Sequence, residues 1–90
     1  MLQVEYTTQF KRDLKLAKKR NKNIKALRDI MKKIEHEEKL SPKLRDHILG
    51  NNWKGHRELH IEPDWLLIYK LVPAEKLAIF VRTGTHSDLF

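Results

Sequence analysis

Cysteine is absent from this sequence, and glycine and proline occur only three times each. Without cysteine, disulfides and thiolate metal sites are both excluded. The scarcity of glycine and proline, together with 40% hydrophobic and 34% charged residues, is typical of an ordered globular domain rather than a disordered tail. A chain of 90 residues supports one domain with a compact core, so we expect residues 1–90 to fold as a unit.

Long apolar runs are also missing. No stretch approaches the roughly 20 residues that span a bilayer, and the N-terminus shows no apolar signal segment. We therefore expect a cytoplasmic protein without a membrane partner. The lack of cysteine fits such a reducing compartment.

Acidic residues are scarce in the first third of the chain. Residues 1–33 contain eleven Lys and Arg against three acids, a net charge of +8, whereas residues 34–90 carry eight basic and nine acidic groups. Such a concentration of positive charge attracts polyanions through its long-range field and through counterion release. We favour a nucleic-acid or ribosomal partner. An acidic protein partner and a merely solvated helix surface are the alternatives.

The first half of the chain predicts a short strand followed by two helices. Val4 and Tyr6 alternate with polar neighbours, as residues of a strand do. Thr7 or Thr8 can cap the first helix, whose apolar residues are spaced i, i+4, i+7. These apolar residues are Phe10, Leu14 and Ala17.

The second helix is predicted after a break at residues 21–23, where Asn23 can serve as its cap. Its core-facing stripe consists of Ile24, Leu27, Ile30, Met31 and Ile34. Ser41 and Pro42 end the helical region, because proline disfavours a helical conformation in the residue before it. The two helices, both rich in Lys and Arg, are expected to form a hairpin.

From residue 53 onward, polar and apolar residues alternate with a period of two, which is typical of strands. We predict three antiparallel strands over residues 53–61, 65–71 and 77–81, with turns at Pro63-Asp64 and around Pro73. The third strand is apolar on both faces, as expected of a central strand. Residues 83–85 then break the sheet and leave a short tail. The order is β-α-α-β-β-β, an α+β domain with an antiparallel meander.

The direction of these strands places four polar residues at one end of the sheet. His60 lies near the end of the first strand of the meander, and Asp64 lies in the turn after it. The third strand runs in the same direction as the first, so Arg82 and His86 emerge at the same end. Neighbouring antiparallel strands lie about 5 Å apart, so these side chains can reach one ligand.

Two histidines, a carboxylate and an arginine suit the cleavage of RNA by its own 2′-hydroxyl without a metal. One group removes the 2′-hydroxyl proton, another protonates the departing 5′-oxygen, and a fixed cation stabilises charge on the phosphoryl group. Histidine titrates near neutral pH and can serve in either proton transfer. An arginine fork matches two phosphate oxygens. Trp53, Trp65 and Phe90 are candidate stacking surfaces for unpaired bases.

Each of these residues also has a purely structural interpretation. A histidine beside a turn is usually a surface residue. Arg82 can be an ion-pair partner of Asp64 or Glu62 and have no further role. Trp65, in a strand that faces a small core, is better explained by packing than by stacking. Phe90 can be a hydrophobic clasp or a frayed end. The functional interpretation depends on the convergence and not on any single residue.

A metal site is a further alternative. His56 and His60 are four residues apart, a spacing that pairs zinc ligands on a helix. In a strand, however, residues at that spacing lie about 13 Å apart. A three-ligand site from His60, Asp64 and His86 stays geometrically open. Because the sequence has neither cysteine nor an H-E-x-x-H motif, we expect no metal and no cofactor.

Several stretches of this sequence closely resemble the YafQ branch of the RelE toxin superfamily. They are DH at 46–47, WKG at 53–55, RE at 57–58, HIEPDW at 60–65, IYK at 68–70 and RTGTHSDLF at 82–90. The combination of H-x-E-P-D-W with R-T-G-T-H is specific, and the resemblance covers essentially the whole chain. It implies a RelE-like fold with a two-helix hairpin packed on a small antiparallel sheet.

The resemblance also implies an active-site set. In this chain it consists of His47, His60, Asp64, Trp65, Arg82, His86 and Phe90. His86 would be the general acid and Arg82 the phosphate clamp. His60 with Asp64 would supply base or orienting functions, and His47 would enter from the loop before the sheet. The resemblance does not say which group is the base.

Members of this family are toxins of bacterial type II toxin–antitoxin pairs that cut messenger RNA in the ribosomal A site without a metal. The resemblance implies a ribosome-dependent mRNA endoribonuclease, monomeric when free and hetero-oligomeric with an antitoxin of ribbon-helix-helix type. His56 stands where relatives carry an aromatic residue and is given no catalytic role. Lys15 and Lys18 of the basic helices are our candidates for binding ribosomal RNA, in competition with the antitoxin. A non-catalytic basic binding module and a degenerate toxin that no longer cuts are the alternatives.

Overall fold

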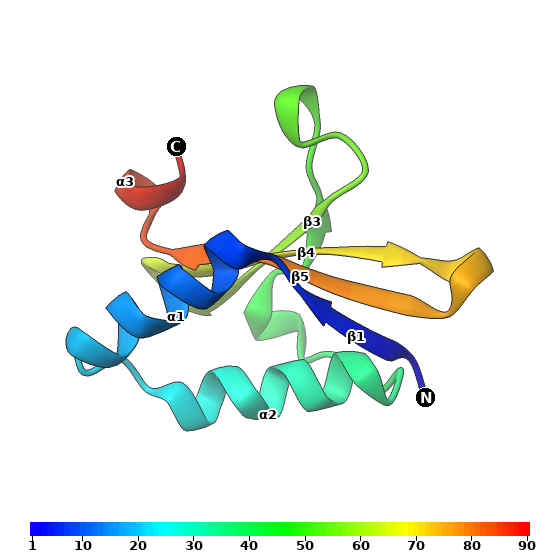
Figure 1. Ribbon diagram of the computed structural model, residues 1–90, viewed down its shortest axis with the longest axis horizontal. Coiled ribbons are helices and arrows are strands. Elements are labelled where there is room, and N and C mark those ends of the chain that lie inside the picture. The colour runs from blue at the N-terminus through cyan, green and yellow to red at the C-terminus, as the bar shows by residue number, and fades with distance from the viewer.

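The computed structural model describes residues 1–90, and its central feature is a five-stranded sheet with two long helices on one face (Figure 1). The strands are β1 (Gln3–Tyr6), β2 (His47–Ile48), β3 (Arg57–Glu62), β4 (Trp65–Val72) and β5 (Leu77–Gly84), in the spatial order β1-β5-β4-β3-β2. The helices are α1 (Thr8–Lys19), α2 (Ile24–Glu35) and a short α3 (His86–Leu89). β1 is parallel to β5, and the other pairs are antiparallel. The predicted α+β class and the antiparallel meander are confirmed.

The two long helices begin where the sequence predicts. The hydroxyl of Thr7 accepts a hydrogen bond from the Phe10 amide (2.9 Å), and the side chain of Asn23 accepts one from the Ala26 amide (3.1 Å). Each cap satisfies an amide that has no partner within the helix. No helix of the chain is both long enough and apolar enough to cross a membrane.

α2 ends earlier than predicted. Its last residue is Glu35, because Glu37 adopts a left-handed conformation (φ 58°) and the Glu38 amide turns back to the Lys33 carbonyl (2.8 Å). This is the hydrogen-bond pattern of a helix C-terminus, here without the usual glycine. Pro42 does not terminate α2; it begins a short 3-10 helix, Pro42–Leu44, that Ser41 caps.

The sheet is covered unequally on its two faces. The main core lies between the sheet and the helices α1 and α2, and consists of Phe10, Ala17, Leu27, Ile30, Ile34, Leu59, Trp65, Leu67, Tyr69, Ala78 and Phe80. On the opposite face, Leu66 and Ile68 of β4 pack only against Leu89 of α3 and a few half-buried neighbours. β4 is therefore apolar on both sides, with the larger cluster on the side of α1 and α2 and the smaller one on the side of α3.

Three predictions for the second half of the chain need correction. The strand predicted from residue 53 begins at Arg57, because residues 51–53 form a short 3-10 helix instead. β5 extends into the predicted break as far as Gly84, where Thr83 and Gly84 still pair with β4 and the Thr83 hydroxyl donates to the Leu66 carbonyl (2.7 Å). The predicted tail is the helix α3, and the two-residue strand β2 was not predicted at all.

Candidate active site

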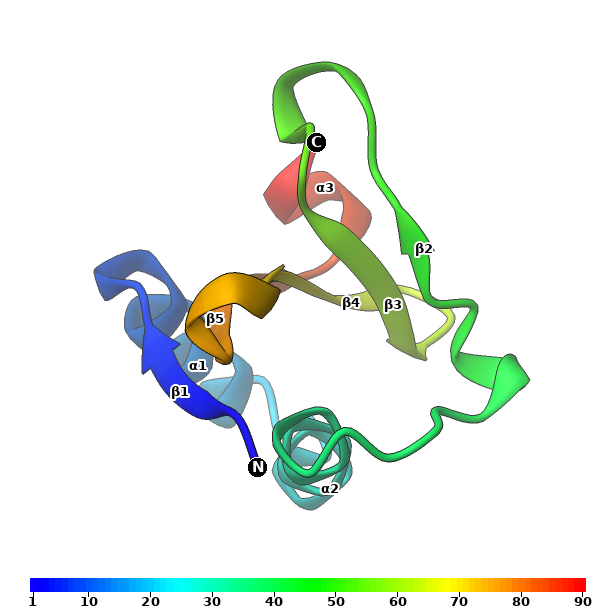
Figure 2. The same cartoon turned by 90° about the vertical axis from the view of Figure 1, so that its right-hand side faces the viewer.

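Three histidines form a row on the sheet face opposite α1 and α2. His47 comes from β2, His60 from β3 and His86 from the first turn of α3. The ring centroids of His47 and His60 are 6.5 Å apart, and those of His60 and His86 are 5.7 Å apart. Figure 2 shows β2, β3 and α3 around this face of the sheet. The strand order thus brings together residues that are far apart in the sequence.

His86 is oriented by Asp64, which lies in the turn between β3 and β4. One carboxylate oxygen of Asp64 accepts hydrogen bonds from both the His86 amide (2.9 Å) and His86 Nδ1 (2.6 Å). These two bonds, the amide first, lower the pKa of Asp64, and the charge of Lys22 adds to the effect. An ionised carboxylate only accepts, so Nδ1 carries the proton of this bond. The other ring nitrogen, Nε2, is left for a substrate.

His47 at the other end of the row has a corresponding arrangement. Its Nδ1 lies 2.7 Å from the Arg45 carbonyl oxygen, which can only accept, so Nδ1 carries the proton there too. Its Nε2 lies 3.6 Å from a carboxylate oxygen of Glu58. Glu58 pairs with His47 across β2 and β3 and is buried, 6% exposed. Sequence reasoning missed Glu58, although its position two residues before His60 on the same strand face was a usable signal.

His60 lies between the other two histidines and is less exposed than either. Its Nδ1 is buried and has no hydrogen-bond partner. A buried polar atom without a partner costs free energy, and native proteins tolerate such atoms mainly where they serve a function. Of the three histidines in the row, the central one is therefore the one whose Nδ1 lacks a hydrogen-bond partner.

Arg82 lies at the same end of the sheet but is turned toward α1. Its Nε and Nη2 donate to the two carboxylate oxygens of Asp13, at 2.8 Å and 3.1 Å. It forms no hydrogen bond with any of the three histidines or with Asp64, so neither Asp64 nor Glu62 is its partner. Asp13 had no assigned role, because nothing in the spacing of α1 indicates that its buried face meets the end of β5.

The two aromatic residues predicted to bind substrate differ sharply in exposure. Trp65 is 1% exposed in the main core, which agrees with the packing alternative and leaves no ring face open for stacking. Phe90 is 62% exposed, and its ring meets that of Trp53 edge-on at a centroid distance of 6.2 Å. Phe90 and Trp53 are thus the aromatic surface beside α3.

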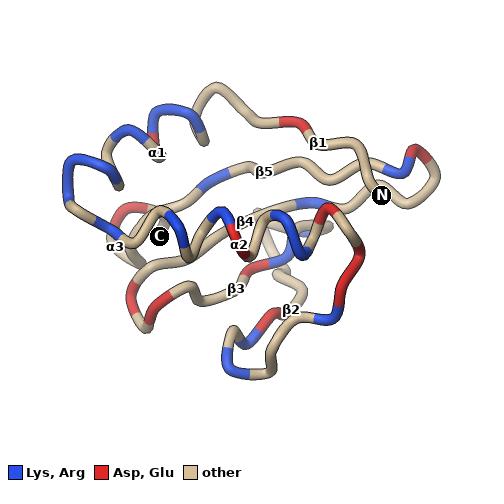
Figure 3. Tube along the Cα trace, turned by 90° about the horizontal axis from the view of Figure 1, so that it is seen from below, with Lys and Arg blue, Asp and Glu red and all other residues tan.

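The basic residues predicted to bind RNA lie on the two long helices. Lys15 and Lys18 are exposed on α1, and Figure 3 shows further Lys and Arg along both α1 and α2. The C-terminal end of α1 is joined to α3 by an ion pair between Arg20 and Asp88 (2.7 Å). This contact connects the basic surface to the helix that carries His86.

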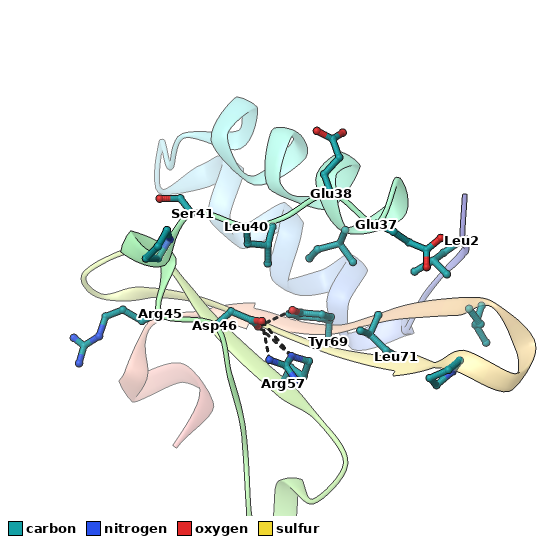
Figure 4. A pocket seen from close by; sticks show the side chains of 14 residues that line it. Leu2, Glu37, Glu38, Leu40, Ser41, Arg45, Asp46, Arg57, Tyr69 and Leu71 are labelled. Carbon is teal, nitrogen blue, oxygen red and sulfur yellow. Dashed lines mark hydrogen bonds and ion pairs between the residues drawn. The ribbon is translucent and has the colours of Figure 1, made fainter.

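A cavity of about 520 Å³ lies away from the histidines, between the end of α2 and the sheet (Figure 4). On its wall, Asp46 accepts hydrogen bonds from the Tyr69 hydroxyl (2.6 Å) and from Arg57 (2.9 Å to Nη2). Asp46 directly precedes His47. This network therefore fixes the segment that carries His47, although it lies on the other side of the strand.

No three His, Asp or Glu side chains are arranged closely enough to hold a metal ion. This applies to His60, Asp64 and His86, the set left open by the sequence: Asp64 faces His86, while His60 Nδ1 is directed into the protein.

Comparison with known proteins agrees with this architecture. The family described as "Bacterial toxin of type II toxin-antitoxin system, YafQ" matches residues 2–90. The mRNA interferase toxin YafQ of Escherichia coli strain B / BL21-DE3 is 47% identical over 88 residues, which cover 97% of this chain and 94% of the relative.

Solved structures give the same result. The chain is similar to YafQ in the E. coli DinJ-YafQ toxin-antitoxin complex, with a TM-score of 0.89 and 44% identity over 99% of this chain and 97% of that one. It is also similar to a metal-bound toxin from Helicobacter pylori, with a TM-score of 0.93 and 38% identity over the full length of both chains. This chain therefore belongs to the YafQ family of bacterial toxins from type II toxin–antitoxin systems.

Proposed function

We propose that this chain is an endoribonuclease toxin that cuts messenger RNA on the ribosome. The observation that carries the proposal is the His86–Asp64 pair at the end of a row of three histidines, with Nε2 of His86 left for a substrate. The name of the E. coli relative, an mRNA interferase toxin, supports the same substrate. In this reaction the RNA supplies its own nucleophile, so the protein needs only proton transfer and charge stabilisation.

His86 is the general acid of the proposed reaction. A base removes the 2′-hydroxyl proton, the 2′-oxygen bonds to phosphorus, and the bond from phosphorus to the 5′-oxygen breaks. The departing oxygen takes a proton from Nε2 of His86, which therefore has to enter this step as the imidazolium and keeps its Nδ1 proton on Asp64. The products are a 2′,3′-cyclic phosphate and a free 5′-hydroxyl. Each such proton transfer is worth about 10²–10⁴-fold in rate.

His47 and His60 are the candidates for the base, and Arg82 for the phosphate clamp. His47 presents Nε2 beside Glu58, and His60 lies at the centre of the row. Phe90 supplies an exposed ring on which a base can stack, a role for which Trp65 is too deeply buried in this conformation. Arg82 keeps part of its guanidinium outside the ion pair with Asp13.

An antitoxin is the second partner that we propose. The related E. coli chain was solved in a toxin-antitoxin complex with DinJ, which supports such a pairing here. We place an acidic segment of a ribbon-helix-helix antitoxin over the basic helices, where it competes with ribosomal RNA for Lys15 and Lys18. With a ribosomal target, the compartment that we propose is the cytoplasm.

The test is cleavage of mRNA on programmed ribosomes in the presence of EDTA. We expect wild type to cut and to leave a 2′,3′-cyclic or 3′-phosphate end, and His86→Ala to lose about 10²–10⁴-fold in rate. His36→Ala, an exposed histidine beyond α2, is the matched control and should cut like wild type. Equal cleavage by the His86→Ala protein would refute the acid assignment, and inhibition by EDTA would favour a metal-dependent mechanism.

A non-catalytic basic binding module is the competing function, and the charge along α1 and α2 favours it. It predicts the opposite pattern. Changes of Lys and Arg in the helices would abolish the toxic effect, while His86→Ala and Arg82→Ala would be silent.

A further inference from the structure

Asp13 is a buried carboxylate to which the proposed chemistry assigns no task. It lies on the side of α1 that faces the sheet and is 8% exposed. One of its oxygens accepts from Arg82 Nε (2.8 Å) and the Thr83 amide (3.2 Å), and the other from Arg82 Nη2 (3.1 Å) and Gln9 Nε2 (3.1 Å). Both oxygens thus have two donors. Such a fully bonded, buried carboxylate has a defined position.

Asp13 engages only one edge of the Arg82 guanidinium. The bonds use Nε and one hydrogen of Nη2, so Nη1 and the second hydrogen of Nη2 stay without a protein partner. The Arg82 side chain is 25% exposed, so part of it is in contact with solvent. When one edge of a guanidinium group is hydrogen-bonded to a carboxylate, its second edge points in a fixed direction. Bidentate binding of a phosphate requires such a fixed direction.

The space beside Arg82 suits an anion. Arg82 lines a cavity of about 190 Å³ between α1, β5 and α3, together with Arg20, Lys22 and Asp88. Arg20 is already paired with Asp88, as Arg82 is with Asp13, so Lys22 is the one cation lining the cavity without an ion-pair partner.

The same cavity adjoins the proposed general acid. Lys22 also acts by its charge on Asp64, the partner of His86. Thr85, the residue before His86, is a further part of the cavity wall. The cavity thus reaches to within one residue of His86 along the chain, although neither His86 nor Asp64 lines it.

We propose that Asp13 is a positioning residue, which holds Arg82 so that its free edge meets a phosphate of the RNA substrate. This inference rests on the proposed function, in which Arg82 binds that phosphate. Asp13 itself does not touch RNA. Its contribution is orientation, and a catalytic group misplaced by about 1 Å can cost about 100-fold in rate.

The competing explanation is that Asp13 only fastens α1 to β5. Both explanations predict a less stable Asp13→Asn protein, so stability alone does not separate them. A double-mutant cycle does, because a positioning residue loses its effect on the reaction once the residue it positions is gone.

The experiment measures kcat and KM for mRNA cleavage on ribosomes with wild type, Asp13→Asn, Arg82→Ala and the double variant. We expect Asp13→Asn to lower kcat/KM by about 100-fold in the wild-type background and by less than about twofold in the Arg82→Ala background. Asp29→Asn, which breaks the exposed ion pair with Lys25 on α2, is the matched control and should leave kcat/KM unchanged.

Two results for Asp13→Asn would overturn the inference while wild type still cuts RNA. One is wild-type kcat/KM in folded Asp13→Asn, and the other is an equal loss with and without Arg82. If Asp13→Asn does not fold, Asp13→Glu goes through the same cycle, since it keeps the charge and displaces the carboxylate by one methylene. Arg82→Ala with full activity would refute the role of both residues. A wild type that cuts no RNA would refute the proposed function, and the inference with it.

Discussion

The rings of His86 and His47 are oriented in the same way, because Nδ1 of each ring forms a hydrogen bond with an oxygen atom of the protein. For His86 the oxygen belongs to Asp64, and for His47 it is the backbone carbonyl of Arg45. A ring held at Nδ1 presents only Nε2 to a ligand, so these contacts fix which nitrogen of each ring can face the RNA. His60, whose Nδ1 is unpaired, is the one member of the row without such support.

Tyr69 offers a test of how the His47 segment is supported. Tyr69→Phe removes the hydroxyl that donates to Asp46 (2.6 Å), and a hydrogen bond to a charged group contributes about 1.5–3 kcal/mol. We expect urea unfolding at pH 7 to show a loss of that size, together with slower RNA cleavage because the residue after Asp46 is His47. Tyr6→Phe, at a hydroxyl for which no hydrogen bond is seen, is the control and should change neither quantity.

The pH dependence of the same pair is a second readout. Burial, reinforced by the neighbouring Asp46 carboxylate, raises the pKa of Tyr69 above its ordinary value of about 10. Stabilisation from a group with a raised pKa is fully present below the pKa of the unfolded chain and is lost as pH rises through the folded one. The stability difference between wild type and Tyr69→Phe should therefore be constant from pH 7 to about 10. A difference that vanished by pH 9 would contradict this account.

At the scale of elements, α3 depends on the rest of the protein. A helix of four residues has no stability of its own, because its few hydrogen bonds do not offset the cost of nucleation. Thr85 and Asp88 form a reciprocal capping box, Arg20 joins Asp88 to α1, and Leu89 packs on β4. Since His86 is the first residue of α3, these contacts also place the proposed general acid.

Asp88→Asn should loosen α3 in a pH-dependent way. The ion pair with Arg20, followed by the Thr85 amide, lowers the pKa of Asp88 to about 2, against about 3.9 in an unfolded chain. Stabilisation from a carboxyl with a depressed pKa is present above the unfolded value and is lost as pH falls through the folded one. Wild type should therefore exceed Asp88→Asn in stability at pH 6, and the gap should close between about pH 4 and pH 2.

Urea unfolding at pH 6, 4 and 2.5 measures that gap, and hydrogen exchange of the Phe90 amide, which bonds to the His86 carbonyl, reports on α3 itself. Asp29→Asn on α2 is the control, because its partner Lys25 is exposed and the pair lies far from α3 in sequence. A gap that did not change with pH would mean that the charge of Asp88 is not what holds α3.

At the scale of the whole molecule, charge and chemistry occupy different sides. The basic helices cover one face of the sheet (Figures 1 and 3). The row of histidines lies on the other face, where the rings of His47, His60 and His86 follow one another. The two meet where Arg20, the residue that follows α1, pairs with Asp88 of α3. This layout suits a ligand much larger than one nucleotide. The helices can bind a polyanion while one of its phosphodiesters lies at the edge of the sheet, beside the histidines.

Charge reversal on α1 tests that division. Lys15→Glu with Lys18→Glu should weaken ribosome binding strongly at low salt and less at high salt, because exposed charges are screened beyond about 8 Å at physiological ionic strength. For each phosphate that the variant no longer neutralises, the slope of log affinity against log salt should fall by about 1. Lys39→Glu, an exposed lysine outside both helices, is the control in the same sedimentation assay. An unchanged binding curve for the α1 variant would show that these lysines do not contact the ribosome.

The sequence by itself determined the long helices and most of the strands of this fold. Period-two and helical spacing located most of the sheet and both long helices, and Thr7 and Asn23 marked the helix starts, because these signals are local. Local patterns failed where structure depends on contacts made elsewhere. β2 is a strand only because β3 lies beside it, and the tail is helical only because α1 and β4 hold it.

The same distinction applies to the site. Strand direction alone placed His60, Asp64 and His86 together, since a meander fixes which ends coincide. Only the tertiary structure decided the partners. Arg82 forms its ion pair with Asp13 and not with Asp64. Trp65 is buried in the core, and Glu58 lies beside His47. Ion pairs and burial depend on distances between elements that are remote in sequence. The spacing of residues within one element cannot predict those distances.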